Sequence, residues 1–285
     1  MPAFTKFVVA GGTGKIGRQI SLALLERGFQ VTVLSRKETD AELTQKGAKL
    51  AIADYSSDSQ LTDLLRGSQV VINTLGMESF AADLQTTLAK AAKAAGVQLF
   101  VSNDFGVDYD IIQAHDQLDL HAFVQGKADF AQTLKEIGLD SLQFYTGFFD
   151  SALAWLFQAD TEKRTARIPG TGDRPFAITT EHEVGQFVAT AFQNLKEEEL
   201  RNTTLRFAST VLSPNELFKQ VGDYKIEYAP VEDSERAAKD LSLGLESFAG
   251  WLRLVIMHGA MSWEGTNDSE RIGYKPTDDV FANLR

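Results

Sequence analysis

Residues 7–20 read FVVAGGTGKIGRQI, and this stretch decides the fold. Four apolar residues predict a strand, and apolar positions at helical spacing follow a cluster of four glycines. Gly12, Gly14 and Gly17 form the pattern G-x-G-x-x-G, while Gly11, Gly14 and Gly17 form G-x-x-G-x-x-G. Glycines let the turn tighten, so that backbone N–H groups approach a pyrophosphate at the positive end of the next helix. Because the cluster lies between a strand and a helix, it predicts a dinucleotide site rather than an ordinary turn.

The first half of the chain alternates short apolar runs with helical patterns. Strands are expected at Lys6–Ala10, Gln30–Leu34, Lys49–Ala53, Val70–Thr74, Gln98–Ser102 and Ser141–Tyr145. Helices are expected at Lys15–Arg27, Ser59–Arg66, Phe80–Ala95 and Gly126–Ile137, each followed by a capping glycine at 28, 67, 96 or 138. The alternation predicts an α/β fold of Rossmann type, a doubly wound parallel sheet with a smaller C-terminal α/β substrate domain.

The regular alternation breaks after Phe149. The later patterns are a loop and strand in RIPGTGDRPFAITT, a helix in EHEVGQFVATAFQNL, a strand in TTLRFAS and a capped helix start in SPNELFKQV. We therefore expect residues 1–150 and about 176–210 to form the dinucleotide-binding Rossmann domain. Residues from about 151–175 and 211–285 are expected to form the substrate-binding domain.

Composition narrows the class of protein. The 285 residues are 44% hydrophobic and 24% charged, which is typical of a globular chain. A net charge of −11 argues against a nucleic-acid partner, and the lack of cysteine excludes disulfides and thiolate chemistry. The N-terminal apolar run is too short for a signal peptide, and FAGWLRLVIMHGAM is interrupted by Arg253 and too short to span a membrane. We expect a cytoplasmic monomer or homodimer with no membrane partner.

The end of the second expected strand indicates which dinucleotide binds. An NAD site usually has an acidic residue here that holds the ribose 2′-hydroxyl. This chain has Ser35, Arg36 and Lys37, with no acid before Glu38. A guanidinium and an ammonium suit a 2′-phosphate, which a carboxylate would repel. A solvated loop after a strand is often basic as well, but the position favours NADP(H).

Several segments together resemble the NmrA-like / isoflavone reductase-like family of atypical short-chain dehydrogenases. They are VVAGGTGKIGRQI, SRK, LFVSNDFGVD, GKADFAQTLKEIGL and YTGFF. The resemblance runs through about residues 4–210 and weakens towards the C-terminus. It implies an oxidoreductase of secondary metabolism, with a Rossmann NADP(H) domain, a small C-terminal domain and a small-molecule substrate in the cleft between them.

The resemblance also implies individual site residues. Those of the pyrophosphate turn are Gly11, Gly12, Thr13, Gly14, Lys15, Ile16 and Gly17. Ser35, Arg36 and Lys37 would contact the 2′-phosphate, and the adenine pocket would begin at Asp54 and Tyr55. Residues expected beside the cofactor riboses and the nicotinamide are Thr74, Leu75, Gly76, Asn103, Asp104, Phe105, Lys127 and Phe148. The aromatic candidates for the substrate pocket are Phe105, Phe148, Phe149 and Trp155.

Lys127 matches the lysine that reductases of this family use in proton transfer. Ordinary short-chain dehydrogenases have Tyr-x-x-x-Lys, whereas this chain has Phe123-Val-Gln-Gly-Lys127, so a catalytic Lys127 works without the tyrosine. Partial burial near the nicotinamide would let it donate a proton as hydride reaches the substrate carbon. His121 and Asn103 are candidates for assistance, although Asn103 stands where the family often has serine. The alternative for Lys127 is a solvated lysine in the first turn of a helix.

Three functions fit the sequence. The leading hypothesis is an NADPH-dependent reductase of a C=O, C=N or activated C=C bond in a small aromatic metabolite. The alternatives are a non-catalytic NADP(H)-binding redox sensor of NmrA type, which would contact a regulator protein, and a non-redox enzyme on the same scaffold. No pair of histidines has the spacing of metal ligands, so we expect no metal.

Overall fold

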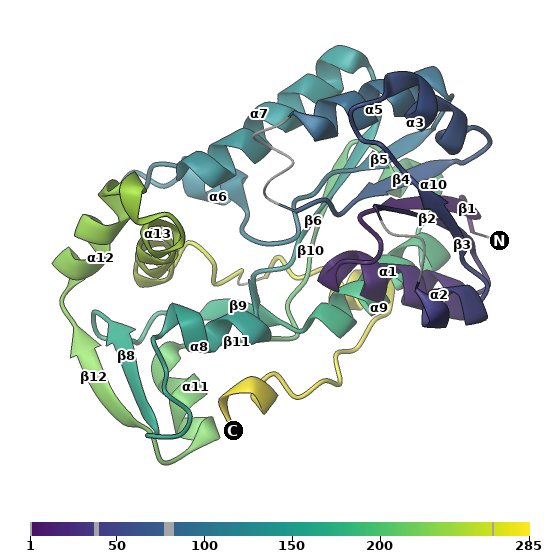
Figure 1. The fold of residues 1–285 in the computed structure, drawn as a ribbon. Helices are drawn as coiled ribbons and strands as arrows, with labels where there is room; N and C mark the ends of the chain where they lie inside the picture. The colour runs from purple at the N-terminus through teal and green to yellow at the C-terminus, as the bar shows by residue number, and fades with distance from the viewer. Residues whose placement is uncertain (1, 37–39, 77–82, 264) are drawn as a thin grey trace.

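Seven parallel strands form the central sheet of the protein (Figure 1). A computed structural model describes residues 2–36, 40–76, 83–263 and 265–285. The strand order is β10-β6-β5-β4-β1-β2-β3. Because β1 lies between β2 and β4, the winding of the chain reverses at β1, and a crevice is expected at the carboxyl ends of the strands there. The predicted Rossmann-type α/β fold is confirmed.

The strands of this sheet lie where the sequence places them, with ends that differ by a residue at most, except that β10 ends three residues before the predicted segment TTLRFAS does. They are β1 (Lys6–Ala10), β2 (Gln30–Ser35), β3 (Lys49–Ile52), β4 (Val70–Asn73), β5 (Leu99–Val101), β6 (Ser141–Tyr145) and β10 (Thr203–Arg206). Val9 of β1 pairs with Val33 of β2 on one side and with Ile72 of β4 on the other. Strands at the centre of a parallel sheet are covered on both faces, which is why these segments are continuously apolar.

Helices cover both faces of the central sheet. They are α1 (Lys15–Glu26), α2 (Ala41–Gln45), α3 (Asp58–Leu65), α5 (Leu84–Ala94), α7 (Ala122–Ile137) and α9 (Glu181–Asn194). The short helix α6 (Tyr109–Gln113) contacts α7 and packs in the apolar cluster of the second lobe. Val9 packs in the same apolar cluster as Ile20 of α1 and Phe187 of α9. Val8 packs in the cluster that holds Leu88 of α5 and residues of α3 and α7. Successive residues of β1 therefore serve opposite cores, as the twofold period of a strand requires.

The helix that carries Lys127 begins earlier than the sequence predicts. The prediction placed its start at Gly126, but α7 begins at Ala122 and is capped by His121. The His121 Nδ1 accepts a hydrogen bond from the Phe123 backbone N–H at 3.3 Å. Lys127 consequently lies in the second turn of the helix. The expected start of α5 at Phe80 falls outside the described residues.

A second lobe contains two small sheets (Figure 1). Its strands are β7 (Phe148–Phe149), β9 (Phe176–Thr179) and β11 (Thr210–Leu212) in one sheet, and β8 (Thr165–Pro169) and β12 (Lys225–Ala229) in the other. The remaining helices are α8 (Leu153–Leu156), α10 (Glu197–Leu200), α11 (Pro214–Val221), α12 (Val231–Lys239), α13 (Leu245–Met257) and α14 (Ser269–Ile272). The division of the chain into two domains stays a prediction; β9 pairs with the small sheet, whereas β10 extends the large one.

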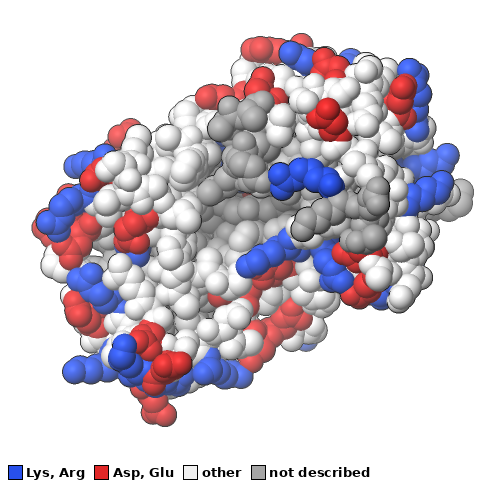
Figure 2. Space-filling model, viewed as in Figure 1, with Lys and Arg blue, Asp and Glu red and all other residues white. Residues whose placement is uncertain are grey.

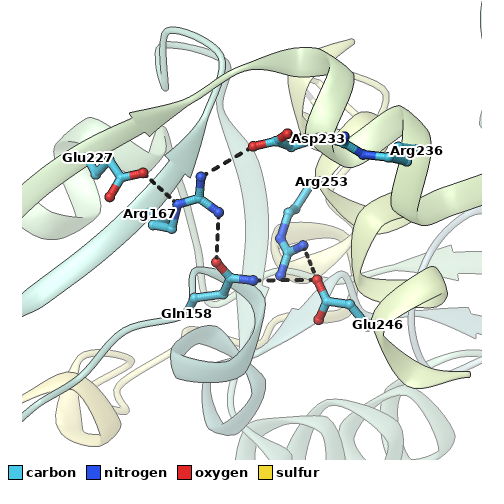
Figure 3. A network of polar contacts seen from close by, with 7 residues as sticks. All are labelled: Gln158, Arg167, Glu227, Asp233, Arg236, Glu246 and Arg253. Atoms are coloured by element: carbon cyan, nitrogen blue, oxygen red, sulfur yellow. Dashed lines mark hydrogen bonds and ion pairs between the residues drawn. The ribbon is translucent and has the colours of Figure 1, made fainter. Parts of the chain in front are cut away.

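Ion pairs join the elements of the second lobe (Figure 3). Arg167 of β8 donates from Nε to Glu227 of β12 at 2.8 Å and from Nη2 to Asp233 of α12 at 3.3 Å. Arg253 of α13 is buried, and its Nη1 donates to Glu246 at 2.6 Å. A buried guanidinium needs such partners because an unpaired charge is costly away from water. Gln158 links the two arginines, because its Oε1 accepts a hydrogen bond from Arg167 Nη1 at 3.3 Å and its Nε2 donates one to Glu246 at 3.5 Å. The network therefore joins β8, β12, α12 and α13.

Gly185 gives a test of the contact between α1 and α9. A Cβ added at Gly185 would lie 2.5 Å from the backbone oxygen of Gln19 in α1. Gly185→Ala should lower the free energy of unfolding by about 1–3 kcal/mol, because a packed helix interface does not accommodate the extra atom. Urea unfolding measures the change, with Gln193→Ala on the exposed side of α9 as control. A stabilised Gly185→Ala protein would show that helix propensity outweighs the clash.

Candidate active site

A cavity of about 900 Å³ opens at the carboxyl ends of the central strands and extends to the second lobe. Figure 2 shows the hollow, with Lys and Arg side chains at its edge. Most of the site residues predicted from the sequence line it: Gly11, Thr13, Gly14, Lys15, Ile16, Ser35, Arg36, Thr74, Leu75, Gly76, Asn103, Phe105, Lys127, Phe148, Phe149 and Trp155. Segments far apart in the sequence thus meet around one space. Which of them touch a cofactor or a substrate stays a prediction.

Some predicted site residues do not belong to the cavity lining. Among the described residues these are Gly12, Gly17, Asp54, Asp104 and His121. Lys37 lies outside the described residues. The lining also includes residues outside the predicted set: Asp40, Leu84, Gly106, Val107, Phe123, Val124, Gly147, Ala152, Phe248 and Leu252.

The glycine turn keeps α1 close to β1 and β4. Gly11 has φ of 74°, and a Cβ there would lie 2.8 Å from the Thr74 carbonyl oxygen. A Cβ on Gly17 would collide with the Thr74 hydroxyl and lie 2.6 Å from the Gly11 oxygen. At Gly12 it would lie 2.8 Å from Val33 Cγ1. Gly12 and Gly17 therefore permit close packing, while Gly11 and Gly14 form part of the cavity wall.

Tyr55, in the loop after β3, supports the glycine turn and was foreseen only as the start of an adenine pocket. Its hydroxyl accepts a hydrogen bond from Gly11 N–H at 3.1 Å and donates one to the Leu34 carbonyl at 3.1 Å. Burial raises the pKa of Tyr55 to about 12, so the phenol stays protonated at neutral pH. The neighbouring Asp54 carboxylate instead accepts a hydrogen bond from the Ser56 backbone N–H at 3.0 Å.

The basic end of the cavity lies where β2 ends. The hydroxyls of Thr13 and Ser35 are hydrogen-bonded at 3.1 Å, and Arg36 and Lys15 also line this end. Asp40 also lines the cavity and was not predicted from the sequence. Its carboxylate accepts hydrogen bonds from the Leu43 backbone N–H and, at 3.3 Å, from Arg18. These donors offset its charge beside the cavity.

Lys127 lines the same cavity as the basic and the aromatic side chains. It is partly buried on α7 and belongs to the lining. Burial lowers the pKa of the Lys127 ammonium, and the Asp104 carboxylate opposes this shift. Asn103 lies nearby in the lining, where its Nδ2 donates to the Leu75 carbonyl. A cation held at this point can deliver a proton to a ligand in the cavity.

His121 is a helix cap in an aromatic cluster. It is 6% exposed, and its ring centroid lies 5.1 Å from that of Phe123, 5.3 Å from Phe248 and 6.0 Å from Trp251. Its Nε2 lies 3.3 Å from the Ser247 hydroxyl. Burial lowers the pKa of His121, which favours the neutral ring. Its assistance in proton transfer stays a prediction, and any such role would be indirect, since His121 is not part of the lining.

Apolar side chains from two lobes form the other end of the cavity. Phe123 of α7 and Phe248 of α13 meet edge to face, with ring centroids 5.6 Å apart. Trp155 of α8 keeps 38% of its surface exposed and faces the same space, as does Leu252. The contribution of α13 could not be read from the sequence, since its apolar stripe resembles that of any core helix.

In the described part of the chain, no group of three or more His, Asp and Glu side chains is placed to hold a metal ion. Across the same residues, every helix is too short or too polar to cross a membrane.

Similarity to known proteins identifies the family of the chain. The profile of the NmrA-like family matches residues 5–246. The chain belongs to the NmrA-like family. This NmrA-like protein is 25% identical to oxidoreductase aprR of Aspergillus flavus, over 98% of each chain. It is 24% identical to phenylcoumaran benzylic ether reductase PT1 of Pinus taeda, over 82% of this chain and 80% of that protein.

Solved structures share the fold at lower identity. A crystal structure of an isoflavone reductase superposes with a TM-score of 0.81 at 22% identity, covering 99% of each chain. The leucoanthocyanidin reductase–NADPH complex from Vitis vinifera has a TM-score of 0.76 at 20% identity, covering 90% of this chain and 87% of that one. The expected kinship with the NmrA-like and isoflavone reductase-like proteins is thereby confirmed.

Gly17 provides a test of the close packing that shapes the turn. Gly17→Ala should lower the free energy of unfolding by about 1–3 kcal/mol without cofactor, because the added Cβ meets backbone atoms of Gly11 and Gly12. Gly14→Ala is the matched control, since its Cβ would lie 3.2 Å from the Gly11 oxygen with no closer neighbour. Urea denaturation measures the free energy of unfolding of both variants. Equal stability of the two would contradict the packing role of Gly17.

Proposed function

We propose that this protein is an NADPH-dependent reductase that acts on a C=O, C=N or activated C=C bond of a small aromatic metabolite. The observation that carries the proposal is that Lys127 lines the same cavity as the glycine turn, with its basic side chains, and a set of aromatic side chains. The names of the relatives, an oxidoreductase and a benzylic ether reductase, support the same class of activity. The leucoanthocyanidin reductase neighbour is itself a complex with NADPH.

The residues present fit a dinucleotide phosphate. Backbone at Gly11 and Gly14 lines the cavity, a Cβ at Gly11 would lie 2.8 Å from the Thr74 carbonyl oxygen, and α1 begins directly after Gly14. The amino end of a helix attracts phosphate. Arg36 and Lys15 add positive charge at this end, where the 2′-phosphate would be held. NADPH, when bound, supplies hydride to the substrate.

The substrate is proposed to occupy the aromatic end. Phe123, Phe148, Trp155 and Phe248 present ring surface there, which suits an apolar ring-bearing molecule. Lys127 then lies within the same cavity as the reacting bond and can give its proton to the substrate atom that gains negative character. The phenyl ring of Phe123 occupies the sequence position of the usual tyrosine and has no proton to give.

A non-catalytic NADP(H) sensor is the second candidate. The lack of a tyrosine at position 123 favours it, whereas a cavity with room and ring surface beside Lys127 favours catalysis. A panel of ring-bearing carbonyls, imines and activated alkenes, monitored by the loss of NADPH absorbance, separates the two. Tight NADPH binding without consumption across the panel would favour the sensor.

Replacing Lys127 tests the proton-transfer role. Lys127→Ala should lower kcat by about 10²–10⁴-fold, the usual contribution of a general acid, and leave the Kd for NADPH within about threefold. Steady-state kinetics on a substrate found in the panel measure the first quantity, and NADPH fluorescence measures the second. Lys135→Ala, near the end of the same helix and outside the lining, is the control. Unchanged turnover in Lys127→Ala would contradict the role.

Replacing Arg36 tests the choice of cofactor. Arg36→Ala should raise the Kd for NADPH by about 10–100-fold, because a charge-assisted hydrogen bond contributes about 1.5–3 kcal/mol. The Kd for NADH should change little, since NADH lacks the 2′-phosphate. Fluorescence titration with both nucleotides gives the ratio, and Arg66→Ala, an exposed arginine at the end of α3, is the control. Equal loss for NADPH and NADH would place Arg36 elsewhere in the binding site.

A further inference from the structure

Two predicted phosphate contacts of the cavity come from separate parts of the chain. The glycine turn follows β1, whereas Ser35 and Arg36 lie at the end of β2, and both groups line the cavity. NADPH carries its pyrophosphate and its 2′-phosphate on one ribose, so the distance between the two groups varies little. A site that already holds its contacts at the matching distance avoids the free-energy cost of ordering them on binding. What fixes the distance between the turn and the end of β2 is therefore part of cofactor recognition.

A triangle of hydrogen bonds joins the turn to β2. The Tyr55 hydroxyl donates to the Leu34 carbonyl at 3.1 Å and accepts from the Gly11 N–H at 3.1 Å. The same Gly11 N–H also donates to the Leu34 carbonyl at 3.1 Å. Gly11 is the first residue of the turn, and Leu34 directly precedes Ser35. Tyr55 thus contacts the backbone of both phosphate subsites from a third segment, the loop after β3.

The Tyr55 hydroxyl serves the backbone rather than a ligand. A phenol has one O–H donor, and that of Tyr55 is used by Leu34. Tyr55 is 6% exposed and packs in the apolar cluster that contains Ala10 and Leu34. Burial raises the pKa of Tyr55 to about 12, so the O–H is kept at neutral pH. The hydroxyl is therefore held in place by the core and keeps its hydrogen bond to β2.

A second tie joins the same two segments. The hydroxyls of Thr13 and Ser35 are hydrogen-bonded at 3.1 Å, and both residues line the cavity. This tie connects two side chains, whereas Tyr55 connects backbone atoms of the turn and of β2. The turn and the end of β2 are thus joined at two points, one through the backbone and one through side chains.

We propose that Tyr55 is a positioning residue that fixes the separation between the glycine turn and the end of β2, with the Thr13–Ser35 pair as a second tie. This inference rests on the proposed function, in which the turn holds the pyrophosphate and Arg36 holds the 2′-phosphate. Without the Tyr55 hydroxyl, each subsite still binds its own phosphate group. A ligand that fills both subsites must then restore their separation, which costs free energy. The loss of affinity should therefore be confined to ligands that carry both groups.

Tyr55→Phe tests this role, because it removes the hydroxyl but keeps the buried ring and the hydrogen bond between Gly11 and Leu34. Isothermal titration calorimetry of the whole protein gives the Kd for NADPH, for NADH, which lacks the 2′-phosphate, and for adenosine 2′-monophosphate, which lacks the pyrophosphate. The Kd for NADPH should rise about 3–10-fold, the effect of one hydrogen bond, while the other two Kd values stay within about twofold. A general loss of stability would not change the ratio of the Kd values for NADPH and NADH.

Tyr224→Phe is the matched control. The Tyr224 hydroxyl donates to the Leu284 carbonyl at 2.9 Å, and neither residue belongs to the cavity lining. This variant should leave all three Kd values unchanged. In Tyr55→Phe, equal rises for NADPH and NADH would restrict Tyr55 to the turn, and equal rises for NADPH and adenosine 2′-monophosphate would restrict it to the 2′-phosphate subsite. Either result, like no change in any Kd, would overturn the proposal.

These measurements need no substrate, so they separate this inference from the proposed reduction. A selective loss of NADPH affinity in Tyr55→Phe supports the inference even if no compound of the panel is reduced. An unchanged ratio of the two Kd values, in a protein that reduces a compound of the panel, overturns the inference alone. A wild-type protein that binds NADPH no more tightly than NADH also overturns it. If Tyr55→Phe does not fold, Thr13→Val, which removes the second tie, takes its place: a loss confined to NADPH supports the fixed separation, and any other result overturns it.

Discussion

The close approach of α1 to β1 and β4 is the constraint on which the rest of the structure depends. Gly11, Gly12 and Gly17 leave no room for a Cβ against Thr74 and Val33. This packing brings the amino end of α1 to the carboxyl end of β1, beside the point where the sheet winding reverses. The glycines that let α1 pack closely therefore also shape the crevice. Helix packing and ligand binding both require glycine at these positions.

The second lobe adds aromatic side chains to that crevice. The Rossmann part supplies backbone, basic side chains and Lys127, while Trp155 and Phe248 come from segments beyond residue 150. A polar end beside an apolar end in one cavity suits two ligands of different chemistry, a phosphate-bearing cofactor and a ring-bearing substrate. Lys127 is buried enough to have a perturbed pKa and open enough to meet a ligand, which is the usual condition of a proton-transfer residue.

The sequence predicted the sheet well because each strand carries its own apolar run and each helix its own stripe and cap. The sequence prediction placed the start of α7 one turn late, because histidine is an uncommon N-cap residue. His121 was therefore interpreted as a residue that could assist proton transfer. Tyr55 was foreseen beside the adenine, but its hydrogen bonds to Gly11 and Leu34 join residues distant in the sequence. Such contacts leave no local pattern.

Local residues by themselves determined the α/β class, the glycine turn and the basic end of the second strand, because these depend on periodicity and on neighbours along the chain. Only the tertiary structure decided that Asp104 turns away from the cavity between Asn103 and Phe105, and that α13 supplies Phe248 to the wall. The physical reason is that burial and charge pairing are properties of three-dimensional neighbourhoods. Lys127 shares a cavity with the glycine turn, which is far from it in the sequence, only because the elements that carry them pack around one sheet.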